Sequence, residues 1–297
     1  MEIIEESKYI KPVGREKIYR WFLRLTKRFS ERQVLAILAV LVGAFAGLGT
    51  YLFEVLLHLI KSCLVNWFDV DTFHILYLIY PGIGIILATL FVKYIVRDNI
   101  SEGVTRVLYA MSRRGSRIAG HNCWTSIVGG ATTIGFGGSV GPEAPIVLTG
   151  AAIGSNIGKL ARLNYKNITL LLCCGAGAAV AAVFKAPITG VVFVLEILML
   201  EITSKSIIPL LLASMTATIT SLVFHGFSPI ISVSLSHGDM FQVEQVPLFI
   251  LLGCFCGIMA FYFTSVNSKV GGFYKVVTQQ WRKWLYASIT LGVLIFI

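Results

Sequence analysis

A single carboxylate lies in an apolar part of the chain, inside a segment that disfavours regular helix. The segment is GFGGSVGPEAP, residues 135–145, and it holds four glycines, two prolines and Glu143. Glu143 is also the only acidic residue between Gly103 and Leu195. A carboxylate at membrane depth is costly and marks a functional site by default. The structural alternative is a carboxylate that caps a neighbouring helix or pairs with an arginine, and the residues alone leave both interpretations open.

The residues around Glu143 have the chemistry of an anion site. Backbone N–H groups are expected to be accessible at three glycines, Gly137, Gly138 and Gly141. Pro145 suits the first turn of a helix, where its missing N–H does no harm. A helix from about Ala144 to Leu160 would direct its positive end at this loop, which binds anions without a full positive charge. Partial charges release an anion readily, as conduction requires, and Glu143 would gate the site by occupying it or leaving it when protonated.

Long apolar runs place this loop in a membrane. The sequence is 56% hydrophobic and 13% charged, whereas about a quarter of the residues of a soluble protein are charged. Several runs are long enough to cross a hydrocarbon core of about 30 Å. They are Val34–Ile60, His74–Val96, Ile168–Phe184, Ser206–Phe224 and Val246–Ser265. We therefore expect an all-α, multi-pass integral membrane protein.

Positive charge orients the chain in the membrane. Nine Lys and Arg residues fall within residues 1–33, and arginines recur in the loop after the second apolar run. The positive-inside rule predicts a cytoplasmic N-terminus, in a plasma (inner) membrane. Trp21, Phe22, Leu25 and Phe29 recur at helical spacing, so residues 1–33 are expected to form an amphipathic lead-in on the membrane surface. The net charge of +10 adjoins membrane segments, which favours membrane lipid as a partner and excludes nucleic acid.

Short, broken apolar pieces fill the middle of the chain, from about Ile118 to Glu201. Their interruptions are GFGGSVGPEAP, TGAAIGSNIG and GAGAAVAAVFKAPITG. Small residues at these spacings let helices pack closely in lipid. Helices broken at membrane depth are tolerated where they face protein or a water-filled cavity, and paired breaks indicate a transport site near the midplane. The six cysteines lack metal-ligand spacing, so no metal site is expected.

The segment GGSVGPEAPIVLTGAAIG, residues 137–154, resembles the pore signature of CLC chloride channels and proton/chloride exchangers. That signature is Gly-Lys/Arg-Glu-Gly-Pro followed by an apolar helix with a pair of glycines. The resemblance places the gating glutamate on Glu143. A shifted register would place Val140 at the gate, but the spacing from Pro145 to the following glycines favours Glu143. The anion-binding positions implied by the resemblance are Gly141, Pro142, Ala144, Pro145 and Ile146.

A second segment, SEGVTRVLYAM at residues 101–111, resembles the Gly-Ser-Gly-Ile-Pro segment of the same family. The serine that binds the central anion there falls on Glu102, and Gly103 follows it. The resemblance implies that Gly103 and the nearby backbone line the pore. A carboxylate at Glu102 would repel chloride unless it is protonated, turned aside or paired with Arg106, which lies one helical turn on.

A third segment, FKAPITGVVFVLEILMLE at residues 184–201, resembles the run Phe-Asn-Ala-Pro-Leu-Ala-Gly that ends in one or two glutamates. Glu196 matches the first glutamate, as a structural residue, whereas the internal proton-transfer glutamate of the exchangers falls on Ile197. Glu201 lies four residues beyond, at a different depth. This substitution favours passive anion conduction, and a proton-coupled exchanger that uses another proton route is the alternative.

The resemblance implies a CLC-type inverted-repeat fold, a homodimer with one pore in each subunit, no enzyme activity and no cofactor. The domains expected are a basic N-terminus (1–33), a first transmembrane repeat with the pore motifs (34–225), and a linker with the start of a second repeat (226–297), which makes the chain an apparently truncated member. A fragment that only associates with a full-length partner is a further alternative. A membrane enzyme with GFGGSVG as a phosphate loop is disfavoured, because no strand precedes the loop and no Lys-Ser/Thr follows it.

Overall fold

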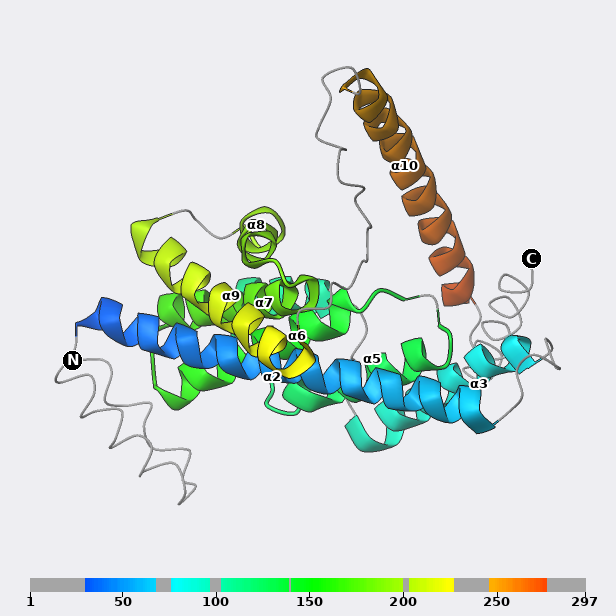
Figure 1. The fold of residues 1–297 in the computed structure, drawn as a ribbon, viewed down its shortest axis with the longest axis horizontal. Coiled ribbons are helices and arrows are strands. Elements are labelled where there is room, and N and C mark those ends of the chain that lie inside the picture. The colour runs from blue at the N-terminus through cyan, green and yellow to red at the C-terminus, as the bar shows by residue number, and fades with distance from the viewer. Residues whose placement is uncertain are drawn as a thin grey trace.

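Helices are the only regular secondary structure in the part of the chain that the structure describes, which confirms the all-α prediction (Figure 1). The structure is a computed structural model, and it describes residues 30–67, 76–96, 103–138, 140–199, 203–226 and 246–276. The elements in chain order are α2 (Glu31–Trp67), α3 (Leu76–Phe91), the π-helical turn η2 (Val92–Val96), α4 (Gly103–Arg113), α5 (Asn122–Gly135), α6 (Glu143–Leu160), α7 (Tyr165–Phe184), α8 (Pro187–Ile197), α9 (Ser204–His225) and α10 (Val246–Val276).

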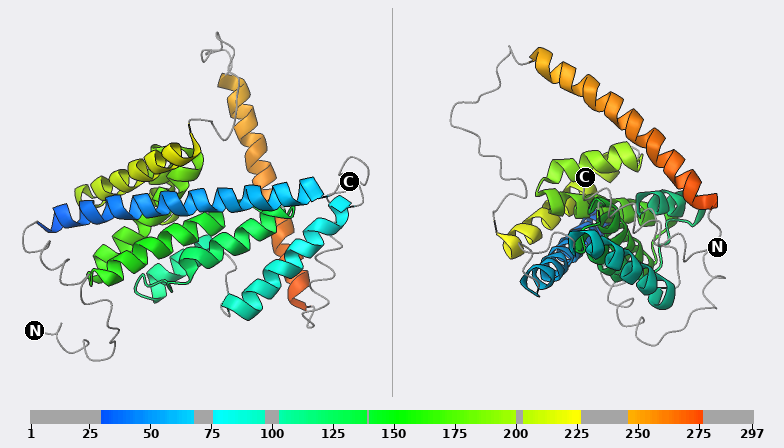
Figure 2. Two further views of the ribbon diagram at one scale, coloured as in Figure 1. Left: turned by 60° about the horizontal axis from the view of Figure 1, so that its bottom comes forward. Right: turned by 90° about the vertical axis from the view of Figure 1, so that its right-hand side faces the viewer.

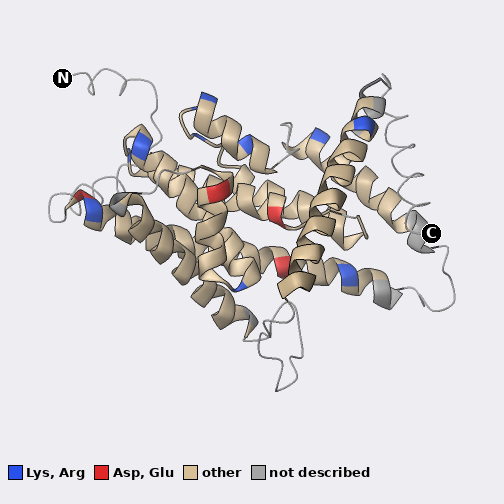
Figure 3. Cartoon of the chain, turned by 90° about the horizontal axis from the view of Figure 1, so that it is seen from above, with Lys and Arg blue, Asp and Glu red and all other residues tan. Residues whose placement is uncertain are grey.

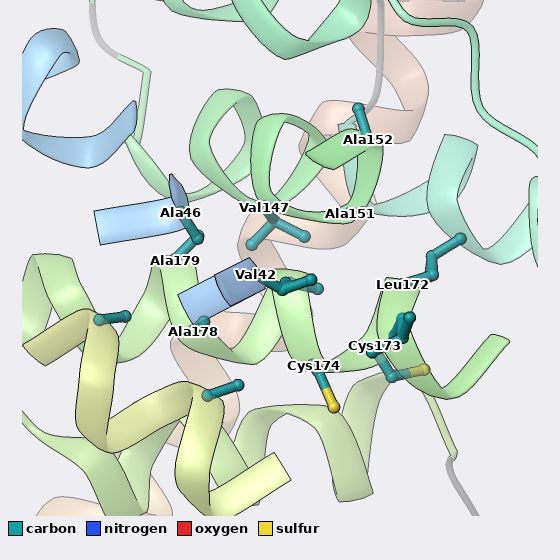
Figure 4. Packing of buried hydrophobic residues seen from close by; sticks show 14 of the residues in the cluster. Val42, Ala46, Val147, Ala151, Ala152, Leu172, Cys173, Cys174, Ala178 and Ala179 are labelled. Atoms are coloured by element: carbon teal, nitrogen blue, oxygen red, sulfur yellow. The ribbon is translucent and has the colours of Figure 1, made fainter. Parts of the chain in front are cut away.

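Helix α7 forms the centre of the packed helices and contacts α2, α6, α8 and α9 (Figure 2). Every residue from Leu170 to Val183 is buried. The core around it consists largely of small side chains, which Figure 4 shows where α2, α6 and α7 meet. Its labelled members include Val42, Ala46, Val147, Ala151, Ala178 and Ala179. Small side chains let the three backbones approach one another. The resulting van der Waals contact drives helix association in lipid, where the hydrophobic effect does not.

Glycines set the spacing where α6 crosses α7. A Cβ on Gly175 would lie 2.8 Å from the carbonyl carbon of Gly150. One turn further along α6, a Cβ on Gly154 would lie 2.7 Å from the carbonyl carbon of Leu171. Neither site has room for a side chain without a shift of one backbone. The prediction that small residues in this region let helices pack closely is therefore confirmed.

Helices α2 and α9 pack against each other in the same way (Figure 1). A Cβ on Gly47 would lie 2.8 Å from the carbonyl oxygen of Ala217. The hydroxyl of Thr218 then donates a hydrogen bond to the carbonyl oxygen of Ala181, at 3.2 Å, and so joins α9 to α7. These contacts make α2, α7 and α9 a continuous support on which α6 rests.

Four described helices are long and apolar enough to cross a membrane, and they contain four of the predicted spans. They are Glu31–Leu64, Tyr165–Phe184, Ser206–Phe224 and Val246–Val270. The predicted span His74–Val96 is a shorter apolar helix, in which α3 contains Pro81 and passes into the turn η2. A proline inside a helix removes one backbone hydrogen bond and bends or breaks the helix. The predicted helix from Ala144 to Leu160 is α6, one residue longer at its start.

Helix α10 extends away from the other helices (Figures 1 and 2). Its most apolar portion makes no buried contact with the rest of the described chain. The helix continues beyond the predicted span Val246–Ser265 and ends at Val276. The residues just beyond that span, Asn267, Ser268 and Lys269, include no proline and do not stop a helix. Most of the predicted lead-in, residues 1–29, lies outside the described residues.

Candidate functional site

The first turns of α4 and α6 meet at one point. A Cβ on Gly103, the first residue of α4, would collide with the carbonyl oxygen of Ala144 and lie 2.7 Å from its carbonyl carbon. Ala144 is the second residue of α6. The absence of a side chain at Gly103 therefore lets the two helix starts lie in backbone contact. This brings together residues of two separate sequence motifs.

The two helices also run in the same direction from that point. The backbone of Ile118, a few residues beyond α4, forms two hydrogen bonds with side chains of α6. Its N–H donates to the hydroxyl of Ser155 at 3.0 Å, and its carbonyl oxygen accepts from Nζ of Lys159. Both partners lie in the last turns of α6. Since the starts meet and the ends are tied together, the positive ends of both helix dipoles converge beside Gly103.

The first turn of α6 has backbone donors that the helix does not use. The first bond of α6 runs from the N–H of Ile146 to the carbonyl oxygen of Pro142, at 3.3 Å. Pro142 stands at the N-cap and offers no side-chain acceptor, and Pro145 has no N–H. The N–H groups of Glu143 and Ala144 are therefore uncapped by any described side chain. Uncapped N–H groups at a helix start are the donors that proteins use to bind anions.

The Glu143 side chain folds back over the loop that precedes α6. A Cβ on Gly141 would collide with Oε2 of Glu143 and lie 3.2 Å from its carboxyl carbon. Glu143 is exposed, and no described residue forms an ion pair or a side-chain hydrogen bond with it. Its charge therefore lies over the loop that leads into α6. Glycine at position 141 is what leaves room for this conformation.

Two glycines of the loop do not serve as predicted. The N–H of Gly137 donates to the carbonyl oxygen of Ile134 at 3.0 Å, and that of Gly138 to Thr133 at 2.9 Å. Both N–H groups are thus occupied, because they satisfy the carbonyl groups left free at the end of α5. Gly137 has φ +88, a left-handed conformation that glycine adopts without strain. The prediction that these N–H groups are accessible was wrong, and Gly141 alone remains of the three.

A residue that the sequence motifs do not include supports Pro145. A Cβ on Gly130 of α5 would lie 2.7 Å from Cβ of Pro145 and 3.3 Å from the ring of Phe53 in α2. Gly130 therefore lets α5 and α2 hold the first turn of α6 from behind. The next residue, Ile146, is 2% exposed and anchors that turn in the core. The glycine pair in α5 is the only sequence signal of this contact, and it has no motif around it.

The other residues singled out from the sequence lie elsewhere. Glu102 precedes α4 and lies outside the described residues, as does Glu201. Glu196 and Ile197 form the last residues of α8, and both are exposed. Helix α8 packs on α7 and α9, so it does not carry Ile197 into the meeting point of α4 and α6.

Acidic residues are sparse throughout the described chain, as Figure 3 shows. They are Glu31, Glu54, Glu143 and Glu196. Among the described residues no group of His, Cys, Asp and Glu is arranged to hold a metal ion. Glu31 and Glu143 each begin a helix, but Glu31 is hydrogen-bonded to Asn167, whereas Glu143 begins the helix whose start meets α4. The site can thus bind an anion through backbone dipoles, in competition with one carboxylate.

Long apolar spans with broken helices between them define a class of integral membrane protein whose breaks face protein or a water-filled cavity. The sequence model of the family described as "Voltage gated chloride channel" matches residues 84–297, which is more than half of the chain. The chain belongs to this family, and the CLC resemblance is confirmed. Its members are not enzymes and need no cofactor, so the alternative of a phosphate-loop enzyme has no support.

Individual relatives agree with the family assignment. A putative chloride channel protein, ClcB-like, from Ralstonia nicotianae is 28% identical over 61% of this chain and 43% of its own length. The H(+)/Cl(-) exchange transporter ClcA of Vibrio vulnificus is 28% identical over 86% of this chain and 56% of its own length. A solved structure, a slow cyanobacterial Cl-/H+ antiporter, has a TM-score of 0.74 at 24% identity and covers 91% of this chain. That match covers 64% of the antiporter, and it shows the fold.

The chain thus spans about half the length of the curated relatives that it matches. The fold of the antiporter is shared over the part of the chain that the match covers.

Proposed function

We propose that this chain contributes the first repeat of a pathway that moves chloride, or a similar anion, across a membrane. The observation that carries the proposal is the contact of Gly103 with Ala144, because it joins two helix starts at one point. Two converging dipoles and unused N–H groups favour an anion there without a fixed cation. An anion held by partial charges leaves quickly, and conduction requires weak binding of this kind. Gly141, Pro142, Pro145 and Ile146 shape the first turn of α6 around it.

Glu143 is the proposed gate. Its carboxylate lies over Gly141, in the loop that leads into the first turn of α6. An ionised carboxylate there and an anion bound at the start of α6 repel each other, so binding of the anion is disfavoured while Glu143 is ionised. Protonation removes the carboxylate charge and opens the donors to the anion. Gating by this residue is therefore expected to depend on pH.

Passive conduction is the proposed mode. Ile197 stands at the position of the proton-transfer glutamate and has no group that binds a proton. The second candidate is proton-coupled exchange through another proton route, and it is favoured by the relatives whose names describe exchangers and antiporters. The proposal also includes a homodimer, a cytoplasmic N-terminus and a plasma (inner) membrane location, which rest on the family resemblance and on the charge distribution.

Reconstitution in liposomes tests this function. The purified protein is placed in vesicles loaded with chloride, and efflux is followed with and without a pH gradient. We expect chloride efflux when valinomycin lets potassium carry the balancing charge. This efflux should move no protons against their gradient. Absence of any anion flux would contradict the proposal. Chloride-driven proton movement would instead establish the exchange candidate.

A further inference from the structure

Cations gather on one surface of the molecule, where α4 and α6 end and where α2 and α7 begin. We refer to it as the basic surface, and every described cation in it is exposed. Its members are Arg32, Arg113, Arg114, Arg117, Arg162 and Lys166. Among the described residues of these segments the only acidic one is Glu31. The basic surface lies at the opposite end of α4 and α6 from the candidate anion site.

Two hydrogen bonds show that these segments form one surface. The hydroxyl of Tyr165, at the start of α7, donates to the carbonyl oxygen of Met111 in α4 at 2.9 Å. The side-chain amide of Asn167 donates to Oε1 of Glu31 at 2.9 Å, which joins α7 to the start of α2. This bond also occupies the one acidic group nearby. The cations of these segments are therefore exposed on the same surface.

The loop that presents the arginines is fixed by buried hydrogen bonds. Ser116 is fully buried, and its hydroxyl lies 2.6 Å from the hydroxyl of Thr169 in α7. Its carbonyl oxygen accepts from the hydroxyl of Ser155 in α6, at 2.8 Å. Ser116 also has φ +56, a left-handed conformation that is sparsely populated for residues with a side chain. A loop held in this way presents its arginines in a preset arrangement, so less entropy is lost when a ligand binds.

Stabilisation of helix dipoles explains only some of the cations on the basic surface. Arg113 lies in the last turn of α4, where a cation stabilises the negative end of the helix dipole. Lys166, in contrast, lies in the first turn of α7, where a cation meets the positive end of the dipole. The position of Lys166 is therefore unfavourable by itself and becomes favourable when an anion lies beside it.

The basic surface is expected to lie at the level of a membrane face. Two of the candidate spans, Glu31–Leu64 and Tyr165–Phe184, begin on it. Phospholipid phosphates lie at this level, and clusters of Lys and Arg next to membrane spans bind anionic lipid. We propose that the basic surface binds the phosphate groups of anionic phospholipids in the adjoining leaflet.

Lipid bound there would act on the ends of α4 and α6. The loop of Ser116 and Ile118 joins both helix ends, through Ser155 and Lys159. Phosphate bound to Arg117 is therefore expected to hold the two helices in register with each other. Their starts, at Gly103 and Ala144, depend on the same register. Anionic lipid is thus expected to stabilise the fold and also to support transport.

Titration of phosphatidylglycerol into the protein in neutral detergent tests the proposal, with the melting temperature as readout. The variant Arg117→Gln/Lys166→Gln removes two charges of the basic surface. Its matched control, Lys61→Gln/Lys269→Gln, removes two exposed lysines from α2 and α10, outside that surface. We expect the lipid to raise the melting temperature of wild type and control alike. Each lost cation weakens attraction to an anionic surface about fivefold, so the double variant should need roughly 25 times more lipid.

Two further arms keep the result interpretable. Inorganic phosphate at matched concentration distinguishes the lipid from a soluble phosphate ligand, and an equal stabilisation by inorganic phosphate would overturn the lipid proposal. An unchanged lipid requirement in the Arg117→Gln/Lys166→Gln variant would also overturn it. The melting temperature requires no transport, so lipid binding by a protein without chloride flux would support the basic surface while contradicting the proposed function.

Discussion

Gly103 lies in backbone contact with Ala144, although the two residues are far apart in the sequence. The contact places the starts of α4 and α6 at one point, and the hydrogen bonds of Ile118 keep the other ends of these helices together. A paired, parallel arrangement adds the two helix dipoles, whereas antiparallel neighbours would cancel them. The candidate anion site therefore depends on a position where no side chain fits.

Replacing Gly103 by Ala is predicted to damage this site. The new Cβ would collide with the carbonyl oxygen of Ala144, so one helix start must move. Overpacking of this kind typically costs about 1–3 kcal/mol of stability. We expect a lower melting temperature and chloride binding weakened about tenfold, which corresponds to about 1.4 kcal/mol. Isothermal titration with chloride and thermal unfolding measure the two effects.

Gly129→Ala in α5 is the matched control. A Cβ on Gly129 meets no atom within 4 Å, so the substitution tests the loss of a helical glycine without a collision. Alanine at such a position usually stabilises a helix, by about 0.5–1 kcal/mol. Equal chloride affinity in wild type and Gly103→Ala would contradict the proposed role of the Gly103–Ala144 contact.

Glu143→Gln is predicted to release the gate. The neutral amide keeps the shape of the side chain but no longer competes as an anion for the N–H groups of α6. We expect faster chloride flux at neutral pH and a flux that no longer changes with pH, both measured in liposomes. Glu196→Gln is the control, because Glu196 is an exposed carboxylate on α8, away from the meeting of α4 and α6. Unchanged flux and pH response in Glu143→Gln would remove Glu143 from the gate.

The sequence predicted the local parts of this site better than their assembly. Pro145 and the small residues after it predicted α6 to within one residue, because a helix start depends on nearby residues. The contact of Gly103 with Ala144 was not predictable, since it depends on a loop held by hydrogen bonds to α6 and α7. The N–H groups of Gly137 and Gly138 were misassigned because the end of α5 uses them, and glycine composition does not reveal which bonds a turn will form.

Some of the predictions from the sequence stay predictions. The domain boundaries and the roles of the motif residues depend on the family resemblance, because family membership does not assign roles to individual side chains. Glu102 lies outside the described residues, and Ile197 lies on an exposed part of α8. Flux measurements on variants are therefore needed to assign roles to these residues.

Val140 provides a test of the alternative register of the pore motif. Val140 is exposed and lies in the loop before α6, with its N–H bonded to the carbonyl oxygen of Gly138 at 2.9 Å. If Glu143 is the gate, Val140→Ala should leave chloride flux and its pH dependence as in wild type. A change of gating in Val140→Ala, together with wild-type behaviour of Glu143→Gln, would favour the shifted register. Flux assays of the two variants side by side decide between the registers.

Gly175→Ala is predicted to destabilise the core on which α6 rests. A Cβ on Gly175 would lie 2.8 Å from the carbonyl carbon of Gly150, so α6 and α7 must separate. We expect a loss of about 1–3 kcal/mol, seen as a lower melting temperature in detergent. Gly257→Ala in α10 is the control, since a Cβ there meets no atom within 4 Å. A melting temperature of Gly175→Ala equal to that of the control would show that the α6–α7 contact is looser than the structure has it.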